Sequence, residues 1–182
     1  MKKKYFIRKK YYSIRKKKFF KVDKSFFIPL SKIVKKYKYK KKNISLYYPI
    51  SYEVNVLNII NIQFFKNFNF LLPVIKKKHS MYFCKWRKND ILRLNSLGIP
   101  EPIKSKIIIP DIMLVPMLAF DKNKNRLGYG KGFYDRYLNS LKRKKKRSLA
   151  IGIAFNFQKY NKLPTNKNDF KLDYIITEKG VL

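Results

Sequence analysis

The chain is short of acidic residues, cysteine and histidine. Its 182 residues include 10 Asp and Glu against 45 Lys and Arg, with one cysteine, Cys84, and one histidine, His79. A single cysteine excludes an internal disulfide framework and a cysteine-rich metal site. A single histidine excludes a zinc site built from several histidines and leaves little room for a Ser–His–Asp triad. The chain therefore fits none of these classes of protein.

Long apolar runs are also missing. No run approaches the roughly 18 residues that a membrane-spanning helix needs. The basic N-terminus, MKKKYFIRKKYYSIRKKK, lacks the apolar segment of a secretory signal. We therefore expect a cytoplasmic protein without a membrane partner. Because 46% of the residues are hydrophobic and 16% aromatic, a buried core is expected, in a single domain spanning residues 1–182.

The shortage of acids leaves a formal net charge of +35, which has two interpretations. The abundant Lys, Asn, Ile, Tyr and Phe all have A/T-rich codons, so the charge can reflect compositional drift. The alternative is an RNA- or ribosome-binding surface, supported by 19 Lys and Arg against one acid, Asp23, in residues 1–42. The lysines are spread along the chain and no RNA-binding motif appears, so we favour drift and expect no specific nucleic-acid partner.

The most informative stretch is residues 110–136, where an apolar run precedes Gly128, Gly130 and Gly132, and a helical pattern follows. A strand, a glycine loop and a helix start in succession present backbone N–H groups to a phosphate. The spacing matches neither the P-loop nor the dinucleotide fingerprint, and a ligand-free turn is the alternative. Arg126 and Lys131 add cations, and Asp135 offers a hard oxygen ligand for the Mg²⁺ that accompanies nucleotide phosphates.

The pattern of elements predicts an α/β fold, a three-layer α/β/α sandwich with a mainly parallel sheet. A helix is expected over residues 2–18, with an apolar stripe of Phe6, Ile7, Tyr11 and Ile14. Lys4 and Arg8, one turn apart, would face a phosphate. Further helices are expected at 26–38 (capped by Ser25), 55–66 and 133–146; strands at 43–49, 70–75, 81–86, 111–115, 149–155 and 173–177; a rigid loop at 97–102; and a solvated turn at His79.

The few acids are selectively placed. Six of the ten lie in Gly/Pro-rich segments or at strand ends, where an α/β sheet builds its ligand site. We therefore expect them to gather near a ligand, although for Glu101 satisfying loop N–H groups is an equal alternative. The six are Glu53, Glu101, Asp111, Asp121, Asp135 and Asp169.

At these residues the chain resembles the 5-formyltetrahydrofolate cyclo-ligase family. The string LVPMLAFDKNKNRLGYGKGFYDRYL is similar to the family pattern VPGxAFDxxGxRLGxGxGYYDRxL, and GIPEP at 98–102 also matches. Met117 and Lys124 stand where glycine is usual. Asn123 and Asn125 tolerate left-handed geometry, so the turn around Lys124 is expected to survive.

The resemblance implies ATP-dependent conversion of 5-formyltetrahydrofolate, with or without a polyglutamate tail, to 5,10-methenyltetrahydrofolate by a monomer. A degenerate sugar-phosphate or CoA-transferase relative is a further alternative. Arg126 and Lys131 would be catalytic, and Asp135 and Asp169 would hold Mg²⁺. ATP would contact Lys4, Arg8, Arg126, Leu127, Gly128, Tyr129, Gly130, Lys131, Gly132, Phe133 and Tyr134. The folate would contact Ile50, Glu53, Asn55, Tyr129, Gly130, Lys131, Gly132 and Phe133.

Overall fold

A seven-stranded sheet forms the centre of the protein. The computed structural model describes residues 2–37, 42–76, 80–103 and 106–182. Neighbouring strands from β10 to β2 run parallel, and β11 and β3 pair antiparallel at the two edges. This confirms the mainly parallel α/β sheet. In spatial order the strands are β11 (Gly180–Val181), β10 (Tyr174–Thr177), β9 (Leu149–Ile153), β6 (Ile112–Pro116), β1 (Asn43–Ser45), β2 (Asn69–Lys76) and β3 (Ser80–Lys85).

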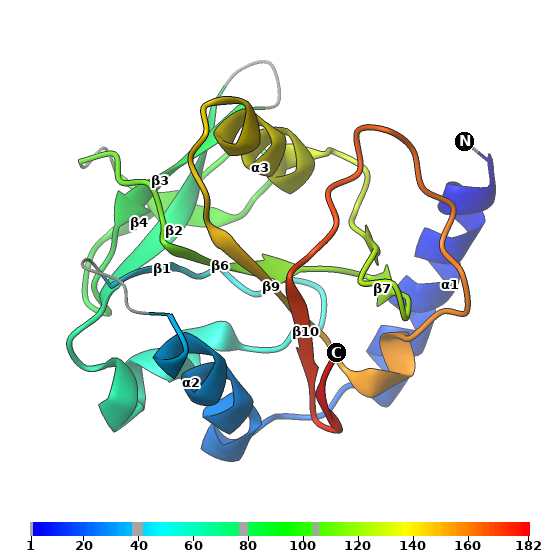
Figure 1. Ribbon diagram of the computed structural model, residues 1–182, viewed down its shortest axis with the longest axis horizontal. Helices are drawn as coiled ribbons and strands as arrows, with labels where there is room; N and C mark the ends of the chain where they lie inside the picture. Colours follow the sequence, from blue (N-terminus) through cyan, green and yellow to red (C-terminus); the bar gives the residue numbers. More distant parts are fainter. Residues whose placement is uncertain (1, 38–41, 77–79, 104–105) are drawn as a thin grey trace.

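Both faces of the sheet are covered, which suits the continuously apolar strands β6 and β9. Along β6, Ile112 and Leu114 point into one core and Met113 and Val115 into the other. Helix α3 (Phe133–Arg143) packs on the second core through Leu138, and Figure 1 shows it on the opposite side of the sheet from α2. The first core is closed by α2 (Ile28–Lys35) and the 3₁₀ helices η1 (Lys24–Phe27), η2 (Val56–Asn61) and η3 (Gln63–Phe65).

Helix α1 (Lys2–Lys18) lies outside these layers, beyond the ends of the strands and beside β7 (Figure 1). Ile7 and Tyr11 pack there against Leu127, which belongs to the short hairpin of β7 (Ala119–Phe120) and β8 (Arg126–Leu127). Tyr11 also donates a 2.8 Å hydrogen bond to the Lys159 carbonyl, next to η4 (Asn156–Gln158). The helix is thereby held against the carboxyl end of the sheet.

The predicted helix boundaries need correction. The segment expected as one helix from residue 26 is η1 followed by α2. Asp23, and not Ser25, caps η1, because its carboxylate accepts a hydrogen bond from the Ser25 N–H. The helix expected at 55–66 is the 3₁₀ pair η2 and η3. In α1 the buried positions are Ile7, Tyr11 and Arg15, whereas Phe6 is 66% exposed. The stripe therefore runs at i, i+4 and i+8 and does not include Phe6.

Backbone conformation explains why two further segments differ from the predicted elements. The loop expected at 97–102 ends in β5 (Pro100–Pro102), which pairs antiparallel with β4 (Leu92–Leu94); each proline lies at an end of the strand. Helix α3 ends at Arg143, earlier than predicted, because Lys145 adopts a left-handed φ of 54°. The turn expected at His79 lies outside the described residues.

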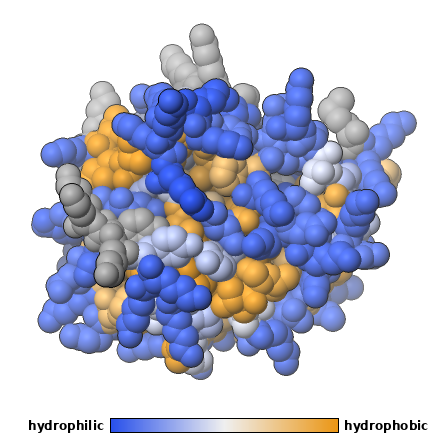
Figure 2. All heavy atoms as spheres, in the orientation of Figure 1, coloured by the Kyte–Doolittle hydropathy of each residue, from blue (hydrophilic) through white to orange (hydrophobic). Residues whose placement is uncertain are grey.

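In the part of the chain that the structure describes, no helix combines the length and apolarity needed to cross a membrane. Figure 2 shows hydrophilic residues over much of the visible face, with separate apolar patches between them. The hydrophilic surface is spread and does not form one stripe.

Candidate active site

A cavity of about 1290 Å³ opens at the carboxyl ends of the parallel strands. Its wall includes the segment after β1, the end of β6, the glycine loop, one face of α1 and the start of α3. This is the edge at which open α/β sheets bind ligands. All of the predicted site residues except Asn55 line it, namely Lys4, Arg8, Ile50, Glu53, Arg126, Leu127, Gly128, Tyr129, Gly130, Lys131, Gly132, Phe133, Tyr134, Asp135 and Asp169.

Asn55 does not line the cavity, contrary to the expectation of a substrate contact. Its side-chain oxygen accepts a 3.1 Å hydrogen bond from the Leu57 N–H and so caps η2. An asparagine at this position is a strong helix cap, which explains its presence without a ligand.

Only half of the six selectively placed acids face the cavity. Their placement therefore has two causes, which are binding a ligand and satisfying backbone N–H groups. Asp111 accepts the Asn43 N–H, and Asp121 accepts the N–H groups of the turn that follows it. The Glu101 carboxylate accepts hydrogen bonds from the Ile75 N–H and the Arg93 guanidinium. These contacts favour the interpretation that Glu101 satisfies N–H groups over the one that places it near a ligand. Buried strand-end acids in a chain with few acids satisfy backbone donors as well as ligands.

The glycine loop adopts the backbone geometry that only glycine accommodates well. Gly130 has a φ of 102° and Gly132, directly before α3, a φ of 66°, whereas Gly128 and Lys131 are not left-handed. A Cβ built on Gly130 would approach the Arg8 Cζ to 3.2 Å. The loop therefore lies tightly over the Arg8 guanidinium, which donates a 2.9 Å hydrogen bond to the Gly128 carbonyl.

Lys4 closes the same side of the cavity one helical turn earlier. Its Nζ lies 2.6 Å from an Asp169 carboxylate oxygen, and both side chains are partly exposed. Asp169 also accepts a 2.8 Å hydrogen bond from the Asn166 N–H. Lys4 and Arg8 thus lie on one helix face, as predicted, and both side chains line the cavity wall.

Asp135 lies at the start of α3 opposite Arg126. The two side chains form a 2.8 Å ion pair in which Arg126 is only 4% exposed, and the same Asp135 oxygen accepts the Phe170 N–H at 3.1 Å. That bond brings the segment containing Asp169 beside Asp135. Among the described residues no group of three or more His, Cys, Asp or Glu side chains could hold a metal. A Mg²⁺ ion bound with a nucleotide typically takes one or two protein carboxylates, and phosphate oxygens complete its coordination shell. Asp135 and Asp169 therefore fit that ion.

A hydrogen-bonded chain runs from Glu53 and Tyr129, which line the cavity, to Arg15, which lies buried behind them. The Tyr129 hydroxyl donates a 2.9 Å bond to a Glu53 oxygen, and the Arg15 guanidinium donates to the Tyr129 hydroxyl. Burial raises the pKa of Glu53 to about 7, with Arg15 opposing that rise most strongly. Burial also raises the pKa of Tyr129, so its hydroxyl stays protonated at neutral pH and can donate to Glu53.

Arg15 is the residue of this region that the sequence interpretation missed. It lies four residues after Tyr11 and seven after Arg8, on the helix face that already carried Lys4. That spacing was available in the sequence, but neighbouring lysines hid it.

Both departures from the family pattern have a structural explanation. Lys124 itself takes the left-handed conformation, with a φ of 63°, and neither Asn123 nor Asn125 does, which corrects the expectation that they would carry the turn. The buried Met117 side chain ends where a Cβ on Gly152 would have to lie. The extra volume of Met117 is accommodated by the glycine in β9.

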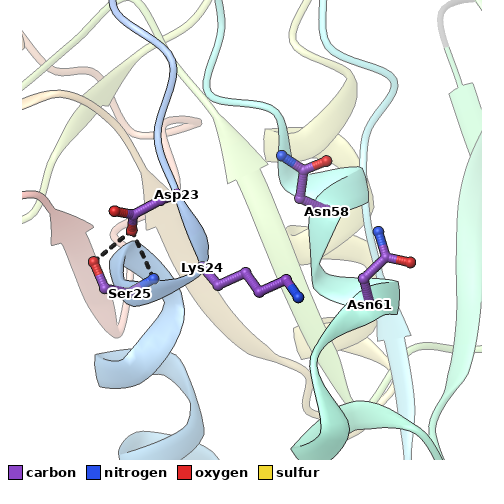
Figure 3. A pocket seen from close by; sticks show the side chains of 5 residues that line it. All are labelled: Asp23, Lys24, Ser25, Asn58 and Asn61. Atoms are coloured by element: carbon purple, nitrogen blue, oxygen red, sulfur yellow. Dashed lines mark hydrogen bonds between the residues drawn. The ribbon is translucent and has the colours of Figure 1, made fainter.

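A second hollow, of about 630 Å³, lies between η1 and η2 (Figure 3). It is lined by Asp23, Lys24, Ser25, Asn58 and Asn61. Asp23 is engaged as the cap of η1, accepting from the Ser25 N–H and hydroxyl. No predicted site residue lies in this hollow, so it has no part in the candidate site.

Known proteins resemble the chain over most of its length. A 5-formyltetrahydrofolate cyclo-ligase of Haemophilus influenzae is 35% identical over 138 residues, covering 72% of this chain and 73% of that protein. The cyclo-ligase of Mycoplasma genitalium is 38% identical over 136 residues, covering 74% and 72%. The 5,10-methenyltetrahydrofolate synthetase of Aquifex aeolicus has a similar solved structure, with a TM-score of 0.73 and 28% identity over 98% of this chain and 91% of that one.

A second solved structure, of a 5,10-methenyltetrahydrofolate synthetase from Mycoplasma pneumoniae, gives a TM-score of 0.69 at 28% identity, covering 95% of this chain and 97% of that one. The sequence model of the 5-formyltetrahydrofolate cyclo-ligase family matches residues 13–178. The glycine loop, the acids and the parallel sheet all fall within that match. The chain therefore belongs to the 5-formyltetrahydrofolate cyclo-ligase family, a family of ligases.

Proposed function

We propose that the protein converts 5-formyltetrahydrofolate to 5,10-methenyltetrahydrofolate with ATP, releasing ADP and phosphate. Its family membership supports this activity. The observation that carries the proposal is that the glycine loop, the cations Lys4 and Arg8 of α1 and three acids meet in the cavity of about 1290 Å³. Ligand cavities commonly measure about 300–1,000 Å³, so this one is large enough for a nucleotide and a folate together.

The reaction begins with transfer of the γ-phosphoryl group to the formyl oxygen. The bond from that phosphorus to ADP breaks, the new P–O bond forms, and the N5 lone pair makes an iminium phosphate. N10 then attacks the formyl carbon, loses its proton, and phosphate leaves with the C–O bond electrons. Such a transfer needs positioning and charge neutralisation more than a covalent nucleophile, which suits a chain with one cysteine and one histidine.

The cations and loop amides would hold the phosphates. Backbone N–H groups of Gly128 to Phe133 form the cradle, and Lys4 and Arg8 approach it from α1. Arg126 and Lys131 would stabilise the charge of the transferring group. Lys4 and Arg126 are paired with Asp169 and Asp135, so those ion pairs would loosen as phosphate oxygens bind.

Asp135 and Asp169 would hold Mg²⁺ together with the phosphates. The ion supplies positive charge that neutralises the β- and γ-phosphate oxygens. The protein's contribution is to hold the two carboxylates at one wall of the cavity. The hydrogen bond from the Phe170 N–H to Asp135 keeps the segment that contains Asp169 beside Asp135.

The folate would occupy the wall formed by Ile50, Glu53 and the glycine loop. An ionised Glu53 can accept hydrogen bonds from the N–H groups of a pterin ring. The basic surface would attract the negatively charged carboxylates of a polyglutamate tail. We further propose that the protein acts as a cytoplasmic monomer.

The test is to mix the protein with Mg-ATP and 5-formyltetrahydrofolate and to record the absorbance of methenyltetrahydrofolate. The signal should require both ATP and Mg²⁺, and omission of either is the control. No signal with folded protein would overturn the proposal. The RNA-binding alternative is not favoured, because family membership accounts for the cavity; tight RNA binding that falls steeply with salt would revive it.

A further inference from the structure

Arg15 is the most deeply buried charged side chain of α1. Its side chain is 1% exposed and it does not line the large cavity. It lies directly behind two residues that do, Tyr129 and Glu53. Any influence of Arg15 on a ligand must therefore pass through these neighbours.

The guanidinium joins three segments that are distant in the chain. Nη1 donates a 3.0 Å hydrogen bond to the Met117 carbonyl, just beyond β6. Nη2 donates to the Tyr129 hydroxyl in the glycine loop, and Cζ lies 5.5 Å from the Tyr129 ring centroid. Nη1 also lies 3.9 Å from a Glu53 oxygen. The planar fork of arginine can make these contacts together, which a lysine ammonium cannot reproduce.

A purely structural explanation of Arg15 meets an energetic objection. A buried charged pair is commonly no more stabilising than apolar residues of the same volume. The Arg15 Nε is buried without a hydrogen-bond partner in the described structure, which adds a desolvation penalty. A helix that needed only to dock could use another apolar residue beside Ile7 and Tyr11.

The neighbours of Glu53 show what the charge of Arg15 does. The side chains that face this carboxyl are Arg15 from α1, Tyr129 from the glycine loop, Tyr47 from the segment after β1, and Tyr134 from α3. Arg15 is the cation of this set. Burial raises the pKa of Glu53 to about 7, and Arg15 is the strongest of the influences that lower it.

We propose that Arg15 is a positioning residue, which holds the Tyr129 hydroxyl and the Glu53 carboxylate in the arrangement that binds the folate. The inference rests on the proposed function and deepens it. It assigns to α1 a role on the folate side of the cavity, in addition to Lys4 and Arg8 on the phosphate side. The residue acts through Tyr129 and Glu53 and not by touching the substrate.

The test measures kcat and KM for 5-formyltetrahydrofolate and for ATP from pH 5.5 to 9 in Arg15→Met and Arg15→Lys. Arg15→Met should raise the folate KM by about tenfold to a hundredfold and leave the ATP KM within about threefold. It should also move the acid limb of kcat/KM for folate to higher pH, because Glu53 loses the charge that favours its ionised form. Arg15→Lys should raise the folate KM but keep the acid limb close to its original pH.

Tyr11→Phe is the matched control. It removes the partly buried hydrogen bond from α1 to the Lys159 carbonyl, one turn before Arg15, without a contact to Tyr129 or Glu53. It should lower the melting temperature while leaving the folate KM and the acid limb unchanged. An Arg15→Met enzyme that behaves like Tyr11→Phe would overturn the proposal.

If Arg15→Met does not fold, a double-mutant cycle with Arg15→Lys and Tyr129→Phe decides. If Arg15 acts through the Tyr129 hydroxyl, the double variant should lose little more folate affinity than Tyr129→Phe alone. Additive losses would overturn the proposal. Wild-type protein that forms no methenyltetrahydrofolate refutes the proposed function itself, whereas active wild type with an unaffected Arg15→Met enzyme refutes only the role of Arg15.

Discussion

Lys4 and Asp169 form a 2.6 Å ion pair although 165 residues separate them in the chain. The contact joins the first turn of α1 to the segment before β10, so residues from both ends of the chain form one wall of the cavity. A ligand that binds either charge must compete with this pair.

Asp135→Asn should abolish turnover while the fold is retained. The amide keeps an oxygen for the Phe170 N–H but loses the charge that pairs with Arg126 and would bind Mg²⁺. The matched control is Asp173→Asn, because Asp173 also accepts a backbone N–H and pairs with an arginine, Arg147, away from the cavity. Turnover with Mg-ATP and circular dichroism are measured; near-normal turnover in Asp135→Asn would exclude it as an essential ligand.

Lys131→Ala should slow turnover about tenfold to a hundredfold without abolishing it, because a supplementary cation contributes on the order of 1–3 kcal/mol. Lys131 is not left-handed, so alanine fits its backbone and is a cleaner change than glycine. Lys142→Ala, an exposed lysine of α3, is the control. A wild-type rate and ATP affinity in Lys131→Ala would mean that this side chain only faces solvent.

Glu53→Gln should change how stability depends on pH. Burial raises the folded-state pKa of Glu53 to about 7 from its ordinary value of 4.5, so between these values the folded state binds more protons than the unfolded state. Wild-type stability should therefore fall as pH rises through this window, by on the order of 3 kcal/mol from this residue. The difference in unfolding free energy between variant and wild type, followed by urea titration, should grow in favour of Glu53→Gln from pH 4.5 to 7 and then level off. A constant difference would contradict the raised pKa.

Lys124→Gly should stabilise the protein by about 0.5–1 kcal/mol, because a left-handed φ is costly for residues with a Cβ and free for glycine. Lys122→Gly, in the same turn but not at a left-handed position, is the control and should be destabilising. Urea denaturation of both variants gives the comparison. Equal destabilisation would show that the backbone at Lys124 is not strained.

Neutralising Lys144, Lys145 and Lys146 should leave turnover unchanged. All three are exposed beyond the end of α3, where cations suit the helix dipole. Asparagine is the suitable replacement at Lys145, whose φ is 54°. Steady-state rates of the triple variant are compared with those of Lys4→Gln, which should raise the ATP KM; a large loss in the triple variant would show that this basic segment has a function.

Features that depend on the local pattern of residues could be predicted from the sequence alone. Apolar runs such as Ile112–Val115 predicted buried strands, because both faces of a parallel strand are covered. The spacing of Gly128, Gly130 and Gly132 before a helical pattern predicted a glycine loop ahead of a helix, and Lys4 and Arg8 were correctly placed on one helix face. These inferences need only the chain's own periodicity.

Which polar residues face the cavity could be seen only once the chain was folded. Glu101 and Asp121 were grouped with Asp135 as acids in loops or at strand ends, yet they bind backbone N–H groups, and Asn55 caps η2. Arg15 is buried against Tyr129 and Glu53 because the glycine loop and the segment after β1 converge on α1. The partner of a buried polar group is set by which distant segments meet, and the local pattern of residues does not contain that information.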